Sequence, residues 1–428
     1  MEKLFKIHKV EIIGMWGNHN ITTELFEDNN IFIGRNGSGK TTFINIIQST
    51  LKVDIPRLKK LSFNKIIIVL KRNDKLINIE LIKKDVNDLL VLEYNIQGEV
   101  YKFDTAIRSM YQIKNGDIVD DINDRKINEL KERLESIIEI RSLAVYRDNL
   151  ETEYVRHIKT RVVTEVDRKL NALLRELNIF LYEKDSEQKM LAKAFEKNVL
   201  LSILYDDELD AISLIKDKGD WDKEKSRLIK AYKELGILNK SVEEKINIHL
   251  EKIEESSKRF ELGNANIEEL IPLTLLKRTQ HILNLSMKME KGKQKIYKPI
   301  ENFLGILNNF FVDKEFKLNE SKDERIRRMA YPFLVEGNRG KIEISELSSG
   351  EKQLLILLTE TVLQREKNVV FIADEPELSL HITWQEQILQ AIKSLNKNAQ
   401  IIIATHSPEI AGSVDDKALI DMEDIING

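Results

Sequence analysis

Cysteine is absent from this sequence, and proline is scarce. The 428 residues include no cysteine, which excludes disulfide bonds, thiolate metal sites and cysteine nucleophiles. Only 6 prolines and 17 glycines are present, too few for a protein built mainly of loops. No proline lies between Pro56 and Pro272, a stretch of 215 residues. Because proline is the strongest breaker of regular structure, this gap predicts a long, helix-rich middle.

The chain also lacks an excess of either charge and a long apolar run. Its 67 Lys and Arg residues nearly balance 71 Asp and Glu residues, which leaves a formal net charge of −4. Nucleic acid or an anionic membrane could therefore be bound only by a local basic patch. No run approaches the roughly 18 apolar residues of a membrane span, and the first residues alternate like a strand rather than a signal peptide. We expect a soluble, cytoplasmic protein with no membrane partner.

The pattern of apolar residues divides the chain into three parts. Residues 1–123 contain short strand-like runs, of which those between about 62 and 103 predict an antiparallel meander. Between 124 and 312 the apolar period becomes helical, with steps of three and four among Val162, Val166, Leu170, Leu173, Leu177 and Leu181. Residues 313–428 return to strand-like runs. The expected fold is an α/β head domain, with mixed or parallel and antiparallel strands, made of the first and third parts, with a helical insertion between them.

A phosphate-binding loop follows the strand-like run at 31–33. Its residues fit the pattern GxxxxGK[ST], in which backbone N–H groups surround phosphates, the lysine reaches the β- and γ-phosphates, and the threonine hydroxyl binds Mg²⁺. The loop stands between a predicted strand and a predicted helix, as such a loop must. It predicts ATP and Mg²⁺ as cofactors, with Thr41 as a metal ligand. The expected nucleotide-binding residues are Gly34, Arg35, Asn36, Gly37, Ser38, Gly39, Lys40, Thr41 and Thr42.

Two nearly pure apolar runs end in further candidate residues. The run 369–373 leads into Asp374 and Glu375, and the run 401–404 leads toward His406. Such runs suit parallel strands covered on both faces, and open α/β sheets bind ligands at the carboxyl ends of these strands. Asp374 would hold Mg²⁺, Glu375 would polarise the attacking water, and His406 would sense the γ-phosphate. The alternatives are exposed strand-end acids and a structural histidine.

The segment LSSGE, residues 347–351, is the most discriminating feature. Ser348 and Glu351 form the S-x-x-E box that caps a helix. A capped helix N-terminus with a free hydroxyl and a glycine can also bind phosphate, so helix capping and phosphate binding are compatible roles for this segment. Ser348, Ser349 and Gly350 are therefore further nucleotide-binding candidates.

The phosphate loop, LSSGE, DEPELSLH and THS, in this order, resemble the ABC-type ATPases, in particular the SMC, RecF and OLD-like branch rather than transporter cassettes. In that family two subunits pair head to tail, and each ATP lies between one subunit's phosphate loop and the other's signature. The resemblance implies a homodimer or higher homo-oligomer through the heads, with Ser348 and Gly350 on the partner's γ-phosphate. It makes Glu375 the catalytic base, with Lys40 and His406 as the other catalytic residues. Residues 379–381 would cross the dimer interface.

The resemblance covers about residues 1–110 and 313–428. Ser349 and Glu351 replace a glycine and a glutamine of the usual LSGGQ signature, changes that are common in this branch. No glutamine loop is evident, and the strand-like Ser142–Tyr146 followed by Arg147 is the candidate for it.

Trp16 has two interpretations. It could stack on adenine, but we interpret it as a core or turn tryptophan.

The spacing of the motifs narrows the function. About 300 residues separate Gly39 from Ser348, far more than in a transporter cassette, and sustained heptads of a long coiled coil are absent. Size and motifs resemble stand-alone ATPases of bacterial anti-phage defence, such as the ATPase subunits of PARIS and Septu and retron-associated ATPases. Because 22 residues follow His406 in this sequence, we expect no Toprim nuclease domain like that of OLD enzymes. We expect an ATP-gated sensor or scaffold that controls a separate effector, a nuclease.

Two other functions stay open. A RecF-like ATPase of DNA repair or genome maintenance would bind DNA through basic stretches such as Lys277–Lys298, which has seven basic residues and one acid, or Arg57–Lys75. A solvated helix face is the interpretation that we favour for both stretches. A purely structural nucleotide-binding protein would bind ATP without turnover.

Overall fold

The fold consists of two compact units. The computed structural model describes residues 5–86, 89–104, 122–143, 164–204, 221–234, 237–263, 266–319, 331–338, 340–378 and 380–426. Unit 1, the head, comprises residues 1–178 and 302–428, and unit 2 comprises residues 179–301. The head is thus assembled from both ends of the sequence, and the residues of the helical unit lie between them in the sequence.

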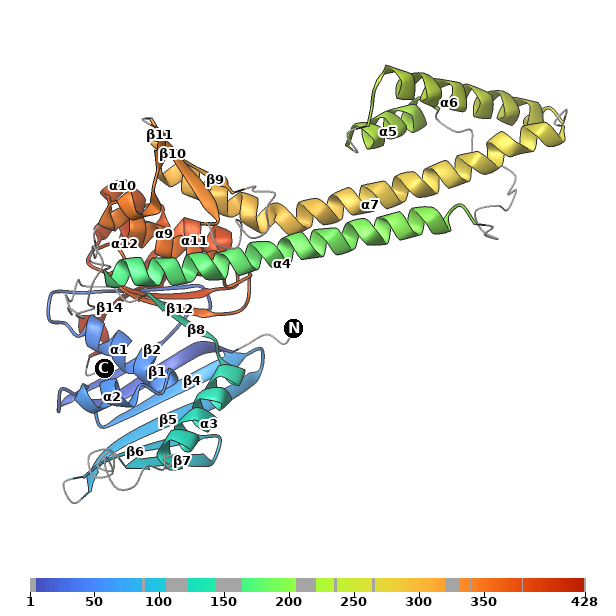
Figure 1. Ribbon diagram of the computed structural model, residues 1–428. Coiled ribbons are helices and arrows are strands. Elements are labelled where there is room, and N and C mark those ends of the chain that lie inside the picture. The colour runs from blue at the N-terminus through green and yellow to red at the C-terminus, as the bar shows by residue number, and fades with distance from the viewer. Residues whose placement is uncertain are drawn as a thin grey trace, which may run out of the picture. The chain divides into compact units, whose positions relative to one another are not determined.

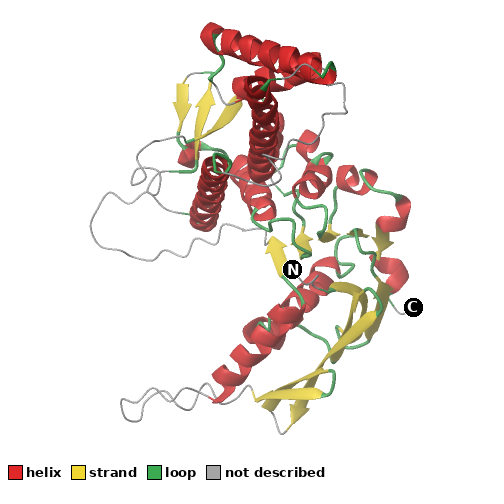
Figure 2. Ribbon diagram, turned by 90° about the vertical axis from the view of Figure 1, so that its right-hand side faces the viewer, coloured by secondary structure: helices red, strands yellow, loops and turns green. Residues whose placement is uncertain are grey.

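The largest sheet among the described residues is antiparallel, in the order β2-β1-β4-β5-β6-β7. Its strands are β1 (Lys6–Met15), β2 (His19–Glu24), β4 (Lys65–Arg72), β5 (Lys75–Val86), β6 (Leu89–Ile96) and β7 (Glu99–Asp104). Apolar residues alternate along β4, where Ile66, Ile68 and Leu70 are buried, so one face of the sheet joins the core. The predicted meander is confirmed as β4 to β7 (Figure 2).

The second sheet is parallel and carries the predicted site residues. Its order is β14-β3-β13-β12-β8, formed by β3 (Asn29–Ile33), β8 (Ile140–Leu143), β12 (Val370–Asp374), β13 (Gln400–Ala404) and β14 (Leu419–Asp421). Helix α1 (Lys40–Leu51) packs against β12 and β13. The rings of Phe32 and Phe43 lie 4.8 Å apart and are fully buried, each burial contributing about 2–3 kcal/mol. The two apolar runs are therefore central parallel strands, as predicted.

A third, smaller sheet and several helices complete the head. The sheet β11-β10-β9 is antiparallel, with β9 (Lys314–Leu318), β10 (Phe333–Gly337) and β11 (Gly340–Ile342). The remaining elements are α2 (Ile55–Lys60), η2 (Ile344–Glu346), α9 (Ser349–Val362), α10 (Ile382–Gln385), α11 (Ile388–Leu395), α12 (Pro408–Gly412), η3 (Asp416–Ala418) and α13 (Met422–Ile425). Aromatic rings of Phe311, Phe316 and Trp384 pack together and fix α10 against the start of β9.

Helix α3 (Ile122–Ile137) and strand β8 belong to the head, whereas the sequence pattern assigns 124–312 to the insertion. Leu130 and Leu134 are buried in the same core as the strands of the antiparallel sheet. β8 then pairs with β12 in the parallel sheet. The compact helical unit is therefore shorter than the predicted insertion, because a change to helical period does not tell which layer a helix packs on.

In its described residues, unit 2 consists of helices: parts of α4 (Glu165–Leu201) and α7 (Ile267–Phe310), with α5 (Trp221–Glu234) and α6 (Lys240–Glu261). Helix α4 begins in the head and continues into unit 2, and α7 returns from unit 2 to the head. Within unit 2 the two helices run side by side (Figure 1), joined by hydrogen bonds of the Tyr297 hydroxyl with Asp185 and Gln188 at 2.6 and 2.9 Å. Among the described helices, none is long and apolar enough to cross a membrane. The α/β fold with a helical insertion is confirmed.

Candidate functional site

The phosphate loop joins β3 to α1 in a conformation that requires glycine. Gly34 and Gly39 have φ values of +140° and +96°, which L-amino acids with a side chain rarely adopt. A Cβ atom on Gly34 would lie 2.9 Å from Ser38 Oγ, and one on Gly39 would lie 2.9 Å from the side chains of Met15 and Trp16. Ser38 Oγ is buried and has no hydrogen-bond partner among the described residues. The loop thus combines exposed backbone with an unsatisfied hydroxyl, as a phosphate site needs.

Lys40 lies inside this loop. Its side-chain Nζ donates hydrogen bonds to the carbonyl oxygens of Gly34 at 2.7 Å and Arg35 at 3.1 Å, and the residue is only 4% exposed. Burial lowers the pKa of Lys40, and the charges of Glu375 and Asp374 partly oppose this effect. The lysine is therefore held at the loop, close to the carboxylates at the end of β12.

Thr41 and Asp374 bring two oxygen atoms together. The Thr41 hydroxyl donates to Asp374 Oδ1 at 3.1 Å, joining the first turn of α1 to the last residue of β12. Mg²⁺ prefers oxygen ligands and is commonly held by one or two protein groups together with phosphate oxygens. In the part of the chain that the structure describes, no cluster of three or more His, Asp or Glu side chains forms a metal site. The pair Thr41 and Asp374 fits Mg²⁺ bound with a nucleotide.

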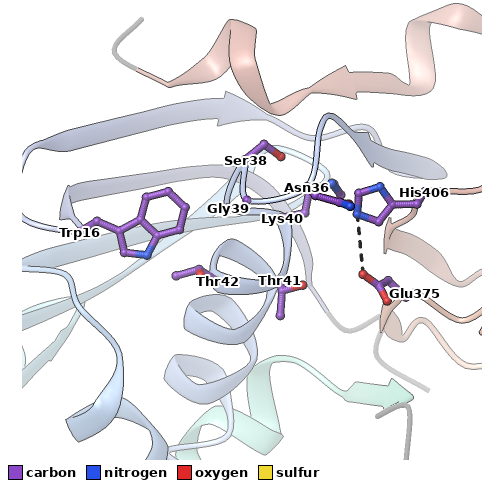
Figure 3. A pocket seen from close by; sticks show the side chains of 10 residues that line it. Trp16, Asn36, Ser38, Gly39, Lys40, Thr41, Thr42, Glu375 and His406 are labelled. Carbon is purple, nitrogen blue, oxygen red and sulfur yellow. Dashed lines mark ion pairs between the residues drawn. The ribbon is translucent and has the colours of Figure 1, made fainter. Parts of the chain in front are cut away.

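Glu375 adopts a strained backbone and faces His406. Its φ is +49°, a left-handed conformation that costs a residue with a side chain on the order of 1–3 kcal/mol and is often found at functional sites. The Glu375 N–H donates to the carbonyl oxygen of Ala404 at 2.7 Å, which ties this turn to the end of β13. His406 Nε2 lies 3.8 Å from Glu375 Oε1 (Figure 3). A candidate base and a candidate sensor thus meet at the same edge of the sheet.

These side chains line one open cavity with a volume of about 190 Å³. The pockets that enclose drug-sized ligands usually measure roughly 300–1,000 Å³, so this one has room for only part of a nucleotide. The lining residues are Trp16, Asn36, Gly37, Ser38, Gly39, Lys40, Thr41, Thr42, Glu375 and His406.

Trp16 lies at the rim of this cavity. It occupies the turn after β1 with a φ of +53° and is 44% exposed. Of the two positions expected from the sequence, core or turn, the structure has Trp16 in a turn and not in the core. The ring reaches the backbone of Gly39, so the exposed aromatic face adjoins the phosphate loop.

The signature residues lie outside the cavity. Ser348 and Ser349 are exposed and Gly350 is buried at the first turn of α9. The predicted capping box is present: Ser348 Oγ accepts from the Glu351 N–H at 3.3 Å, and Glu351 Oε2 accepts from the Ser348 N–H at 2.8 Å. Burial alone would raise the pKa of Glu351, but hydrogen bonds from Lys314 and Ser348 hold it below its usual value. None of the described residues that line the cavity comes from the signature.

The remaining sequence candidates have separate positions. Arg35 is exposed and its Nε lies 3.6 Å from Glu423 Oε1. His381 caps α10 by accepting from the Thr383 N–H. Ser379 and Arg147 lie outside the described residues, and of the candidate glutamine-loop strand only its first residues are described, in β8.

Sequence reasoning missed Glu377. Its side chain is 8% exposed, and its Oε1 atom accepts hydrogen bonds from the Thr405 hydroxyl, the His406 N–H and the Ser407 N–H at 2.5, 2.9 and 3.2 Å. From the sequence alone, an acidic residue that follows a proline, as Glu377 does, is expected to be a solvent-exposed loop residue. The signal that could have found it is its place inside the segment DEPELSLH, two residues after Glu375.

The known proteins that are similar to this chain include probable ATPases. A family model described as "AAA domain, putative AbiEii toxin, Type IV TA system" matches residues 30–412. "Retron Ec83 probable ATPase" of Escherichia coli is 28% identical over 102 residues, 21% of this chain and 19% of that protein. "Retron Vc95 probable ATPase" of Vibrio cholerae serotype O1 biovar El Tor is 27% identical over 164 residues, 32% of each protein. The matches thus span a fifth to a third of these relatives' lengths.

Solved structures with similar backbones include SMC heads. The SMC head domain of Pyrococcus furiosus with an extended coiled coil, bound to the C-terminal domain of ScpA, has a TM-score of 0.47 at 13% identity, over 98% of this chain and 93% of that one. The SMC head of Pyrococcus yayanosii with a coiled coil and joint has a TM-score of 0.47 at 14% identity, over 98% and 95% of the two chains.

Proposed function

We propose, from the premise that this chain belongs to the family described as "AAA domain, putative AbiEii toxin, Type IV TA system", that it is an ATP-gated scaffold. It binds and hydrolyses ATP with Mg²⁺ in a composite site between two heads, and the nucleotide state controls a separate effector, a nuclease, in bacterial anti-phage defence. The observation that carries the proposal is the meeting of Lys40, Thr41, Asp374, Glu375 and His406 at one sheet edge.

Each of these side chains has a role in hydrolysis. Lys40 and the loop N–H groups would bind the β- and γ-phosphates, and Thr41 with Asp374 would hold the metal ion. Mg²⁺, when bound, neutralises charge on the β- and γ-phosphate oxygens. Glu375 accepts a proton from the attacking water, and His406 contacts the γ-phosphate.

A second head completes the site. The cavity at the phosphate loop is smaller than a nucleotide pocket, and the signature presents exposed serine hydroxyls at a capped helix N-terminus elsewhere on the head. Such an N-terminus attracts anions through its dipole and N–H groups. A head-to-tail homodimer would place Ser348 and Gly350 of one subunit on the γ-phosphate held by the other.

Mixing two inactive variants tests the composite site. Lys40→Ala removes the phosphate-loop cation, and Ser348→Arg blocks the signature, so each homodimer should lack turnover. In a mixed dimer one site keeps both intact halves, so an equimolar, re-equilibrated mixture should recover about a quarter of wild-type turnover. Turnover that stays at the level of the single variants, although mixed dimers are detected, would contradict this arrangement.

Ion pairs connect the signature helix α9 to the beginning of α4 and to the segment that follows α7. Glu351 pairs with Lys314, four residues after α7. The next residue, Lys352, lies 2.9 Å from Asp167 Oδ1 in the first turn of α4. Further along, the buried Glu360 accepts from Lys169 of α4 at 2.6 Å. Engagement of the signature by a partner's nucleotide would therefore act on the bases of α4 and α7, which lead into unit 2.

Unit 2 is the proposed effector-binding part. The relatives are named as probable ATPases of retrons, and this association with retrons supports the proposed defence role. A second candidate function remains, because Lys288, Lys291, Lys295 and Lys298 are exposed on α7 at spacings of three and four, which place them on one helix face. That face suits direct contact with DNA phosphates, as in a RecF-like ATPase.

The purified protein should hydrolyse ATP with Mg²⁺ while leaving DNA and tRNA intact, because the nuclease belongs to a separate effector. Gel analysis of both nucleic acids, alongside phosphate release, measures this, and Lys40→Ala serves as the control for contaminating activity. Cleavage that depends on Lys40 would sink the scaffold proposal. DNA binding that falls steeply with salt and is lost in a variant of the four lysines would favour the second function.

A further inference from the structure

The buried carboxylate of Glu377 binds three consecutive residues of the loop that carries His406. One oxygen, Oε1, accepts from the Thr405 hydroxyl and from the His406 and Ser407 N–H groups. The other oxygen, Oε2, is buried with no partner among the described residues. Burying a carboxylate costs free energy unless it is hydrogen-bonded, and here Oε1 accepts all three of these hydrogen bonds. The arrangement therefore depends on an acceptor at one fixed point.

Glu377 also belongs to the turn that carries Glu375. The Leu378 N–H donates to the Glu375 carbonyl oxygen at 3.1 Å, and the Leu380 N–H donates to the Glu377 carbonyl oxygen at 2.9 Å. This turn links β12 to the loop that leads into α10. The side chain of Glu377 thus joins the turn after β12 to the loop after β13.

We infer that Glu377 is a positioning residue that fixes His406 relative to Glu375, and so aligns the γ-phosphate sensor with the base. This inference rests on the proposed function. Its effect comes from hydrogen-bond geometry: without the acceptor, the His406 backbone loses a tether, and the 3.8 Å approach of the two side chains is no longer fixed. Misplacement of reacting groups by about 1 Å can cost on the order of a hundredfold in rate.

A matched pair of substitutions separates acceptor from charge. Glu377→Gln keeps a carbonyl oxygen for the three donors but removes the charge, which also acts on Lys40. Glu377→Ala removes both. We expect kcat for ATP to fall about tenfold or more in Glu377→Ala, with KM within threefold, and to stay within about fivefold in Glu377→Gln. Loss of kcat in both variants, or in neither, would overturn the inference.

A double-mutant cycle with His406→Ala tests whether Glu377 acts through His406. If it does, Glu377→Ala should add less than a threefold loss in the His406→Ala background. Losses that multiply fully would overturn the inference. If Glu377→Ala does not fold, Thr405→Val takes its place, because it removes one of the three donors and leaves the carboxylate.

A spectroscopic readout is independent of turnover. In ¹³C-histidine-labelled protein without nucleotide, the His406 ring signal is assigned from its absence in His406→Gln. It should move or broaden in Glu377→Ala and keep its position in Glu377→Gln, and an unchanged signal in Glu377→Ala would overturn the inference. Wild-type protein without Lys40-dependent turnover would instead refute the proposed function, so the two failures are distinguishable.

Discussion

ATP turnover is expected to fall about 10²–10⁴-fold when Glu375 is replaced by Gln, while ATP binding is kept, because general-base catalysis contributes rate enhancements of that order. Glutamine has nearly the same shape as glutamate but cannot accept the proton of the attacking water. The cavity, Lys40 and the metal ligands remain, so the nucleotide should persist in the site. The Glu375→Gln protein should therefore accumulate as the ATP-bound dimer.

Phosphate release and size-exclusion chromatography with ATP and Mg²⁺ measure this prediction. Glu366→Gln is a matched control, because Glu366 is also left-handed, with a φ of +54°, and is exposed in the turn after α9. The control should turn over ATP like the wild type. Normal turnover in Glu375→Gln itself would refute the assignment of the base.

Lys40→Ala is expected to weaken ATP binding at least about 30-fold, since removing one partner of a buried, hydrogen-bonded charge pair costs roughly 2–5 kcal/mol. The buried ammonium, which now donates to the Gly34 and Arg35 carbonyl oxygens, is the main cation at the loop. Without it, Mg²⁺ alone would offset the repulsion between the phosphates and the carboxylates of Glu375 and Asp374.

Titration calorimetry with ATP and Mg²⁺ tests this second prediction. Lys60→Ala on α2 is the control, because Lys60 is an exposed lysine and does not line the cavity. Melting curves of both variants show whether the loop still folds. If folded Lys40→Ala bound ATP with unchanged affinity, the assignment of Lys40 as a phosphate-binding residue would be wrong.

The parts of the fold that the sequence predicted are those in which residue type and burial coincide. β12 and β13 are covered on both faces, so each is a continuous apolar run, and the phosphate loop requires glycine where φ is positive. The predicted resemblance to retron-associated ATPases is confirmed by the family match over residues 30–412 and by the retron relatives.

Other features could not be read from local pattern because tertiary contacts decide them. The helix at 122–137 has an amphipathic pattern that would suit either unit, and only its packing against the head assigns it there. Glu377 is polar and follows a proline, yet it is buried because three donors from β13's end converge on it. Trp16 is apolar yet exposed, since its turn projects it to the cavity rim.

Strands that are far apart in the sequence pair in the parallel sheet, and this affects the order in which the two sheets can fold. Leu143 pairs with Ala373, 230 positions later, and β3 lies between β13 and β14. The antiparallel sheet has mostly local pairings and can form early during synthesis, whereas the parallel sheet must wait for distant strands. When α4 pairs with α7, the effective loop between β8 and the later strands of the parallel sheet becomes shorter. Early pairing of these two helices would therefore bring the two sequence-distant parts of the parallel sheet closer together while the chain folds.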